Sequence, residues 1–187
     1  MDNVKSQRLQ NGMKTLDIVY CAIGVALIAV CSWITVPMTV PFTLQTLAVF
    51  AVLLLLGGEK GTIATLVYVL MGAIGIPVFA GFSGGLGILL GSTGGYIIGF
   101  IFIGLIYIAL TRIFGRKLHI EIISLVLGLI VCYAFGTGWF MYVYMKSSGP
   151  VGLFTVLSWC VFPFIIPDLA KMAVAVIISR RVRPYIK

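Results

Sequence analysis

Long apolar runs, separated only by short polar breaks, are the feature that most constrains this chain. The run Leu16–Val36 is as long as the roughly 20 apolar residues that cross a bilayer as a helix, and several later runs approach this length. Hydrophobic residues make up 61% of the 187 residues and charged residues only 10%, whereas a soluble domain carries about 25% charged residues. A soluble globule of this size has no means of burying so much apolar surface. The sequence therefore predicts an all-α, polytopic membrane protein.

Hydropathy and helix-breaking residues divide the chain into six predicted transmembrane helices. They are Leu16–Val36, Thr43–Leu56, Gly61–Ile76, Thr93–Phe114, Ile120–Tyr144 and Phe162–Ser179. Residues 57–61 ("GGEKG") are expected to form a tight turn, and "LFTVLSWCV" a short interfacial helix. Because no hydrophilic domain interrupts the pattern, residues 1–187 are expected to form one transmembrane domain, with 1–15 as a polar cytoplasmic segment.

The basic residues indicate the orientation. Of the 13 lysines and arginines, Lys171 lies within a span and Lys146 on one side, which leaves eleven on the side of the two termini. Short cytoplasmic loops carry such an excess, so both termini are expected in the cytoplasm. The formal net charge of +8 is then a topology signal that also favours anionic lipid, and nucleic-acid binding is not expected.

The two outer loops, 35–46 and 77–96, carry no charge, and the second contains several large apolar residues among its glycines. Water-exposed loops do not normally show so many large apolar groups. The second and third spans are also short, about 21 and 24 Å by helical rise. We expect a hollow at the outer end, into which both loops fold as a lid. The alternative is a hydrophobic plug that binds nothing.

An aspartate and a lysine, Asp168 and Lys171, interrupt the last apolar run in "PDLAKMAVA". Their i, i+3 spacing places them on one helix face, and Pro167 is suited to the first helical position before them. Ionisable residues inside a membrane normally face the protein interior and are functional candidates. One interpretation is an ion pair that anchors the helix to its neighbours. The other is a binding site for adjacent N–H and C=O groups, as in a urea or lactam.

Other chemistry finds little support in the sequence. The four cysteines lie in or beside apolar runs without CxxC spacing, and His119 lacks partners, so neither a metal site nor a cofactor is expected. No GxxxxGK[ST] motif is present to hold ATP phosphates. An intramembrane enzyme would need a nucleophile–base pair, and an ion-coupled carrier an inverted repeat or broken helices. A membrane scaffold would need no charge pair under a lid.

Several motifs in order carry a family resemblance: "VPFTLQTLAV" before the second span, "GSTGGYIIGF" before the fourth, and "PDLAKMAVA" in the sixth. With these motifs and six spans, the chain resembles the BioY family, the biotin-binding S components of energy-coupling factor (ECF) vitamin transporters. The resemblance implies biotin uptake across a bacterial cell membrane without enzymatic activity of this chain. It also implies three partner subunits: a transmembrane coupling subunit and two ATPases, which would hydrolyse the ATP.

The resemblance also implies which residues bind biotin. Asp168 would accept a hydrogen bond from a ureido N–H, and Lys171 would donate one to the ureido oxygen. Further candidates at the lid and rim are Thr43, Gln45, Tyr96 and Trp33. From the residues alone, the first two would equally cap the second span, and the two aromatic residues would suit a membrane-interface belt.

Small residues on the first span, Ala22 and Ala26 with Ala29 following, match the AxxxA signature by which such S components dock the coupling subunit. Small residues four apart allow close helix approach, which internal packing would use equally well. A similar stripe at Gly91, Gly95 and Gly99 is expected to serve internal packing.

Overall fold

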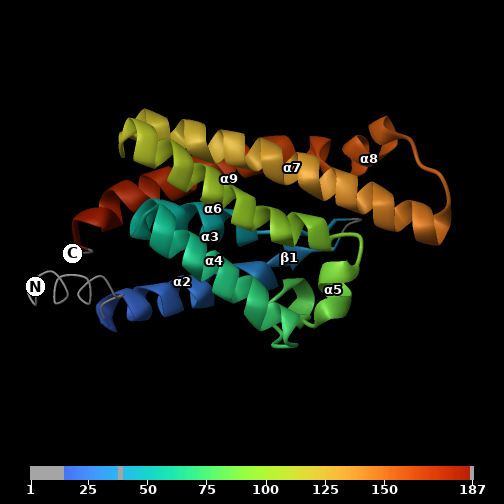
Figure 1. The fold of residues 1–187 in the computed structure, drawn as a ribbon, viewed down its shortest axis with the longest axis horizontal. Coiled ribbons are helices and arrows are strands. Elements are labelled where there is room, and N and C mark those ends of the chain that lie inside the picture. Colours follow the sequence, from blue (N-terminus) through green and yellow to red (C-terminus); the bar gives the residue numbers. More distant parts are fainter. Residues whose placement is uncertain (1–14, 38–39, 186–187) are drawn as a thin grey trace, which may run out of the picture.

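The computed structural model describes residues 15–37 and 40–185, which form an almost entirely helical bundle (Figure 1). Its elements in chain order are α2 (Thr15–Trp33), β1 (Thr35–Val36), β2 (Phe42–Thr43), α3 (Gln45–Leu56), α4 (Gly58–Ala73), the 3-10 turn η1 (Ala80–Phe82), α5 (Leu86–Leu90), α6 (Gly94–Phe114), α7 (Leu118–Ser148), α8 (Leu153–Cys160), α9 (Phe162–Val182) and the 3-10 turn η2 (Arg183–Tyr185). The predicted all-α class is therefore confirmed. Most of the predicted N-terminal segment, residues 1–14, lies outside the described residues.

The helices that correspond to the predicted spans fall into two length classes. Four apolar segments are long enough to cross a bilayer: Thr15–Trp33, Gly94–Phe114, Leu118–Ser148 and Leu153–Tyr185. The predicted second and third spans correspond to α3 and α4, which have 12 and 16 residues. At 1.5 Å per residue these helices rise only about 18 and 24 Å, less than the roughly 30 Å apolar core of a bilayer. The chain is thus a multi-pass membrane protein in which two helices are short.

The short helices lie between longer ones. Helix α3 packs against α9, α4 packs against α2 and α6, and α6 and α7 form a long antiparallel pair. In Figure 1, α2 begins and α9 ends at the same end of the bundle. The β1–β2 hairpin, α5 and α8 lie toward the opposite end. The hairpin is antiparallel, with Thr35 opposite Thr43.

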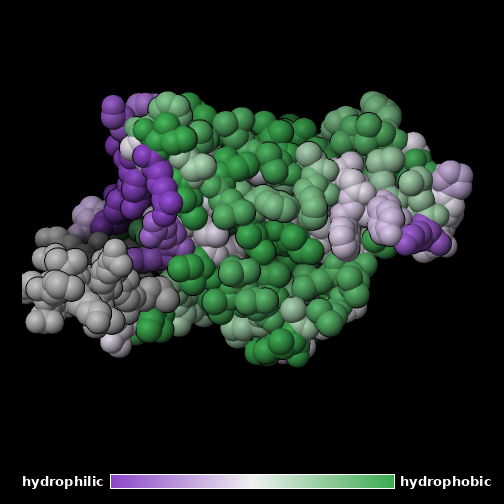
Figure 2. Space-filling model, viewed as in Figure 1, coloured by the Kyte–Doolittle hydropathy of each residue, from purple (hydrophilic) through white to green (hydrophobic). Residues whose placement is uncertain are grey.

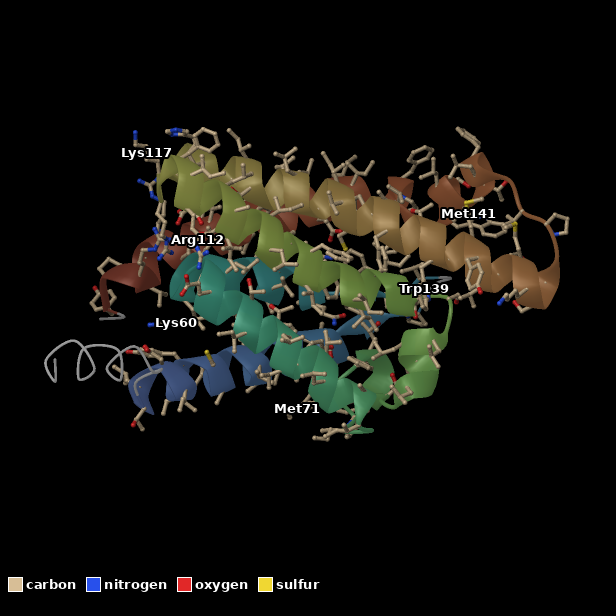
Figure 3. All side chains as sticks on the ribbon, viewed as in Figure 1. Lys60, Met71, Arg112, Lys117, Trp139 and Met141 are labelled. Atoms are coloured by element: carbon tan, nitrogen blue, oxygen red, sulfur yellow. The ribbon has the colours of Figure 1, made fainter. Side chains whose placement is uncertain are left out.

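Charge is concentrated at the end where α2 begins. Figure 2 shows hydrophilic residues there and a broad hydrophobic surface over the middle of the bundle. The labelled side chains of Lys60, Arg112 and Lys117 lie at this end in Figure 3, whereas Trp139 and Met141 lie toward the other. This distribution agrees with the orientation predicted from the basic residues.

Three glycines explain how closely the helices pack. The link between α3 and α4 is Gly57 alone, at φ +86°, so α4 begins at Gly58 rather than at Gly61 as predicted. Along α6, a Cβ on Gly95 would lie 2.3 Å from Trp139, and one on Gly99 2.6 Å from Cys132 Sγ. This glycine face is therefore an internal contact with α7, as predicted.

Helix α9 begins at the residue predicted for the sixth span, but the place of Pro167 in it differs from the prediction. The helix begins at Phe162 and runs through Pro167, with Pro163 in its first turn. A proline in the first turn removes an N–H that has no helical partner there. At Pro167 the helix loses only the bond to the carbonyl of Pro163, close to its N-terminus. Asp168 therefore lies in the second turn of α9 rather than in the first.

Candidate functional site

A cavity of about 310 Å³, here called the central cavity, lies among α3, α6, α7 and α9 beneath the outer loops. Its loop residues come from both predicted lid segments. They are Val40, Pro41, Phe79, Ser83 and Thr93, together with Ala80 of η1 and Ile88 of the short helix α5. Over the whole lining, apolar side chains are in the majority, as in small-molecule sites generally. The predicted hollow is therefore present, and both outer loops contribute to its wall.

The charged pair lies in this cavity and is almost completely buried. Lys171 Nζ is 2.8 Å from Asp168 Oδ1, and their side chains are 7% and 4% exposed. Thr46 Oγ1 on α3 donates to the same carboxylate oxygen at 2.8 Å, and Lys171 Nζ donates to Thr46 Oγ1 at 3.2 Å. Tyr133 on α7 donates to Asp168 Oδ2 at 2.6 Å. Three helices thus meet at one carboxylate.

The free hydrogen-bonding capacity of the pair can be counted. A carboxylate accepts about four hydrogen bonds, and Asp168 receives three from Thr46, Tyr133 and Lys171. The ammonium group of Lys171 has three N–H donors. Two of them point to Asp168 and Thr46, and Nζ also lies over the Phe42 ring, 4.1 Å from its centroid. Among the described residues, one acceptor position on Oδ2 and one donor of Lys171 therefore have no partner.

Phe42 connects the hairpin to the charged pair. It lies in β2, and its ring stacks on Phe164 of α9 with 6.2 Å between centroids. Phe164 lines the central cavity one helical turn before Asp168. The contacts of Phe42 therefore hold the hairpin against α9 beside the charged pair.

Three further predicted residues, Thr43, Gln45 and Tyr96, line the same cavity and are buried. The Thr43 hydroxyl accepts the backbone N–H of Gln45 at 3.2 Å, while the N-cap of α3 is Leu44. Tyr96 OH lies 3.1 Å from Thr137 Oγ1. A buried tyrosine with an internal partner does not belong to an interfacial belt, so that alternative does not hold.

Trp33 is not among the residues that line the central cavity. Its indole N–H donates to Pro77 O at 3.0 Å, and its ring stacks on Phe82 with 4.8 Å between centroids. Trp33 therefore contacts the outer loop 77–83. The predicted stacking of this residue on a ligand receives no support from its position.

Sequence reasoning missed Thr46, Tyr133 and Phe42. A signal for Thr46 existed, because it follows Thr43 and Gln45 in the same motif and would have been a natural extension of that set. No such signal existed for Tyr133, because it is one of several aromatic residues in an apolar helix. Only the tertiary fold brings it to Asp168.

The small-residue stripe on α2 is divided between surface and interior. Ala22 and Ala26 are exposed, and they lie beside exposed Ile23 and Leu27. Ala29 is buried at 6% exposure. Packing inside the described part of the chain therefore accounts for Ala29 but not for Ala22 and Ala26, which remain accessible to a partner helix.

The sequence and the fold both match known proteins. The family model described as the BioY family matches residues 4–187. A relative from Thermotoga maritima named "Biotin transporter BioY" is 38% identical over 168 residues, which cover 89% of this chain and 95% of the relative. One from Pyrococcus horikoshii named "Probable biotin transporter BioY" is 40% identical over 172 residues, covering 91% and 98%.

Among solved structures, the chain is similar to a crystal structure of "the S-component for biotin from an ECF-type ABC transporter". The TM-score is 0.78 and the sequence identity 29%, with 92% of this chain and 95% of the other covered. The similarity therefore extends over nearly the whole fold.

Proposed function

The chain belongs to the BioY family, and from this premise we propose that it is the biotin-binding S component of an ECF-type vitamin transporter. The observation that carries the proposal is the buried Asp168–Lys171 pair in the wall of the central cavity. Each of the two charged groups has one hydrogen-bonding position open, and apolar side chains surround them. Such a site suits a largely apolar group with one compact polar part.

The bicyclic part of biotin has this chemistry, because its fused rings are apolar except for the ureido group, and the carboxylate lies at the far end of an aliphatic side chain. A ureido group offers two N–H donors and one carbonyl acceptor. Asp168 Oδ2 has one acceptor position left for an N–H, and Lys171 has one N–H left for the carbonyl oxygen. The Lys171 contact with Phe42 gives way when the ammonium group turns to the ligand.

The remaining candidates fit the same ligand. Thr43, Gln45 and Tyr96 are the other polar residues of the predicted set that line the cavity. A volume of about 310 Å³ is at the lower end of the range for small-molecule sites, roughly 300–1,000 Å³. This size favours a vitamin as small as biotin over a larger one such as riboflavin.

The assembly follows from the two ends of the bundle. The cavity lies beneath the outer loops, so biotin enters from outside a bacterial cytoplasmic membrane, and the basic end faces the cytoplasm. The exposed Ala22–Ala26 stripe docks a transmembrane coupling subunit, and two ATPases bound to that subunit supply the energy.

A binding titration tests the proposal. The purified chain in detergent should bind biotin one-to-one without ATP and should ignore riboflavin and thiamine. A folded sample that shows no binding at micromolar biotin would refute the proposed function.

A further inference from the structure

A chain of buried hydrogen bonds connects the cavity wall to the outer loop and to α2. The backbone carbonyl of Val78 accepts from Tyr68 OH at 3.0 Å and from Ser32 Oγ at 2.5 Å. Tyr68 and Ser32 are completely buried, and Val78 is 5% exposed. A carbonyl oxygen only accepts, so the proton of the Tyr68 hydroxyl must point toward Val78.

This direction determines the role of Gln45. Gln45 lies 2.7 Å from Tyr68 OH through its terminal side-chain amide. Since Tyr68 donates its only proton to Val78, its oxygen must accept, and the Gln45 group that faces it must be the NH₂. The Gln45 side chain therefore has one orientation, with the carbonyl oxygen Oε1 at its other corner.

The Oε1 atom is available to a ligand. Gln45 is 5% exposed and lines the central cavity. Within residues 15–37 and 40–185, no hydrogen bond to Oε1 is formed. Oε1 is not among the buried side-chain atoms of this part of the chain that lack a partner, so it is open to the cavity, where an N–H group of a ligand could bind it.

We propose that Tyr68 is a positioning residue that sets Gln45 as an acceptor for a ligand N–H and thereby determines which side of the ligand the cavity recognises. This inference rests on the proposed function. With biotin in the cavity, one ureido N–H binds Asp168, the other binds Gln45 Oε1, and Lys171 binds the ureido oxygen. The cavity then distinguishes a cyclic urea from rings with only one N–H.

A packing role for Tyr68 makes a different prediction. The Tyr68 ring meets Phe79 edge-on at 5.6 Å, and Phe79 lines the cavity close to Gly72. If Tyr68 served only to hold Phe79 and the outer loop, loss of its hydroxyl would weaken all related ligands by the same factor. Discrimination between ligands therefore separates the two roles.

The experiment compares biotin with its two cyclic carbamate analogues, in each of which a different ureido N–H is replaced by oxygen. In the parent, the analogue that places oxygen against Gln45 Oε1 should bind at least about tenfold more weakly than biotin, because a hydrogen bond is lost and two acceptors face each other. In Tyr68→Phe the amide is free to turn its NH₂ to that oxygen. The loss of affinity of this analogue relative to biotin should then fall to roughly threefold or less.

Two further variants complete the test. Gln45→Leu has no amide and should likewise lose the discrimination against this analogue, whether or not Tyr68→Phe folds. Tyr107→Phe is the matched control, since this buried hydroxyl binds Glu121 in the opposite end of the bundle, and it should keep the parent's discrimination. The second analogue lacks the N–H for Asp168. Its affinity relative to biotin should be reduced to the same extent in every variant.

Each outcome has one meaning. A parent that binds the analogue with oxygen against Gln45 as tightly as biotin would overturn the role of Gln45. Equal weakening of biotin and both analogues in Tyr68→Phe would overturn the positioning role of Tyr68. A folded parent that does not bind biotin would instead refute the proposed function itself.

Discussion

Tyr133 and Asp168, 35 residues apart in the chain, are joined by a 2.6 Å hydrogen bond that ties α7 to α9 at the central cavity. Thr46 adds α3 through the other carboxylate oxygen. An ion pair between residues i and i+3 of one helix needs no such partners. The structure therefore makes Asp168 the meeting point of three helices and places the free capacity of its carboxylate inside a cavity.

The first prediction concerns Asp168 itself. Asp168→Asn keeps the shape but removes the charge that a ureido N–H would bind, and such charge-assisted bonds are worth roughly 1.5–3 kcal/mol. Biotin affinity should therefore fall by about 10- to 100-fold. Lys171→Met should also weaken binding, and isothermal titration of folded samples measures both effects.

The double mutant separates a binding role from a purely structural one. Removing one member of a buried ion pair leaves an uncompensated charge, whereas removing both is often harmless to stability. Asp168→Asn/Lys171→Met should therefore fold but fail to recover biotin binding. Parental affinity in this double mutant would contradict the assignment of the pair to the ligand.

A second prediction tests the support that Tyr133 gives to Asp168. Tyr133→Phe removes one donor from the carboxylate while keeping the ring, and hydrogen bonds to charged groups contribute about 1.5–3 kcal/mol. The variant should unfold at a lower temperature and bind biotin more weakly. Tyr142→Phe is the control, because in the described part of the chain its hydroxyl bonds only the exposed Lys146. Equal behaviour of the two variants would argue against a role for Tyr133.

The charged part of the site was predictable, whereas its neutral partners were not. Asp168 and Lys171 stand out because ionisable groups are costly in a membrane and their spacing puts them on one helix face. Tyr133 and Tyr68 are neutral residues common in apolar helices, and only the tertiary fold brings them to their partners. The orientation of the Gln45 side chain depends on its partner Tyr68, so it could not be predicted from the sequence either.

The ends of the helices were also partly predictable from the sequence and partly dependent on tertiary packing. Apolar run lengths located the long helices to within a few residues, since that pattern is dictated by the bilayer. The start of α9 at Phe162 was predicted, but Pro167 was wrongly assigned to the first helical position, because a proline was treated as a helix boundary. Pro163 fits the first turn instead, and the helix continues through Pro167. Packing against α3 compensates there for a weak local preference.

A third prediction addresses docking. Ala22→Trp or Ala26→Trp should block co-purification with a coupling subunit, because a large side chain prevents close approach of a partner helix to α2. Both alanines are exposed, so biotin binding by the isolated chain should be unchanged. Ala134→Trp places the same group on the exposed face of α7 and should not affect docking. Intact complexes with the α2 variants would refute the assignment.

A fourth prediction uses two glycines of α7. A Cβ on Gly136 would lie 2.2 Å from the Tyr96 ring, whereas a Cβ on Gly138 would have no neighbour within 4 Å. Gly136→Ala should therefore displace Tyr96 in the cavity wall and lower both thermal stability and biotin affinity. Gly138→Ala should leave affinity unchanged, since it only adds a methyl group to an exposed helix position. If Gly136→Ala bound biotin like the parent, the wall at Tyr96 would not matter for the ligand.

The last prediction concerns the end of the bundle opposite the cavity. There Glu121 is buried at 3% side-chain exposure and accepts from Arg183 at 2.6 Å, Arg116 at 3.2 Å and Tyr107 at 2.8 Å. Both arginines also donate to the carbonyl of Leu54 at the end of α3, at 2.6 and 3.0 Å. The cluster therefore binds α3, α6, α7 and the end of α9 together.

Glu121→Gln should destabilise the chain because it leaves two guanidinium groups without their counter-charge. The arginines are partly exposed, so the cost should fall below that of a fully buried pair, at about 1–3 kcal/mol. Thermal unfolding in detergent should show a Tm lower by roughly 3–10 °C. Glu59→Gln is the control, since its ion pair with Arg112 is exposed on both sides and should hardly affect Tm. A Glu121→Gln variant that unfolds at the parental temperature would show that backbone packing alone closes this end of the bundle.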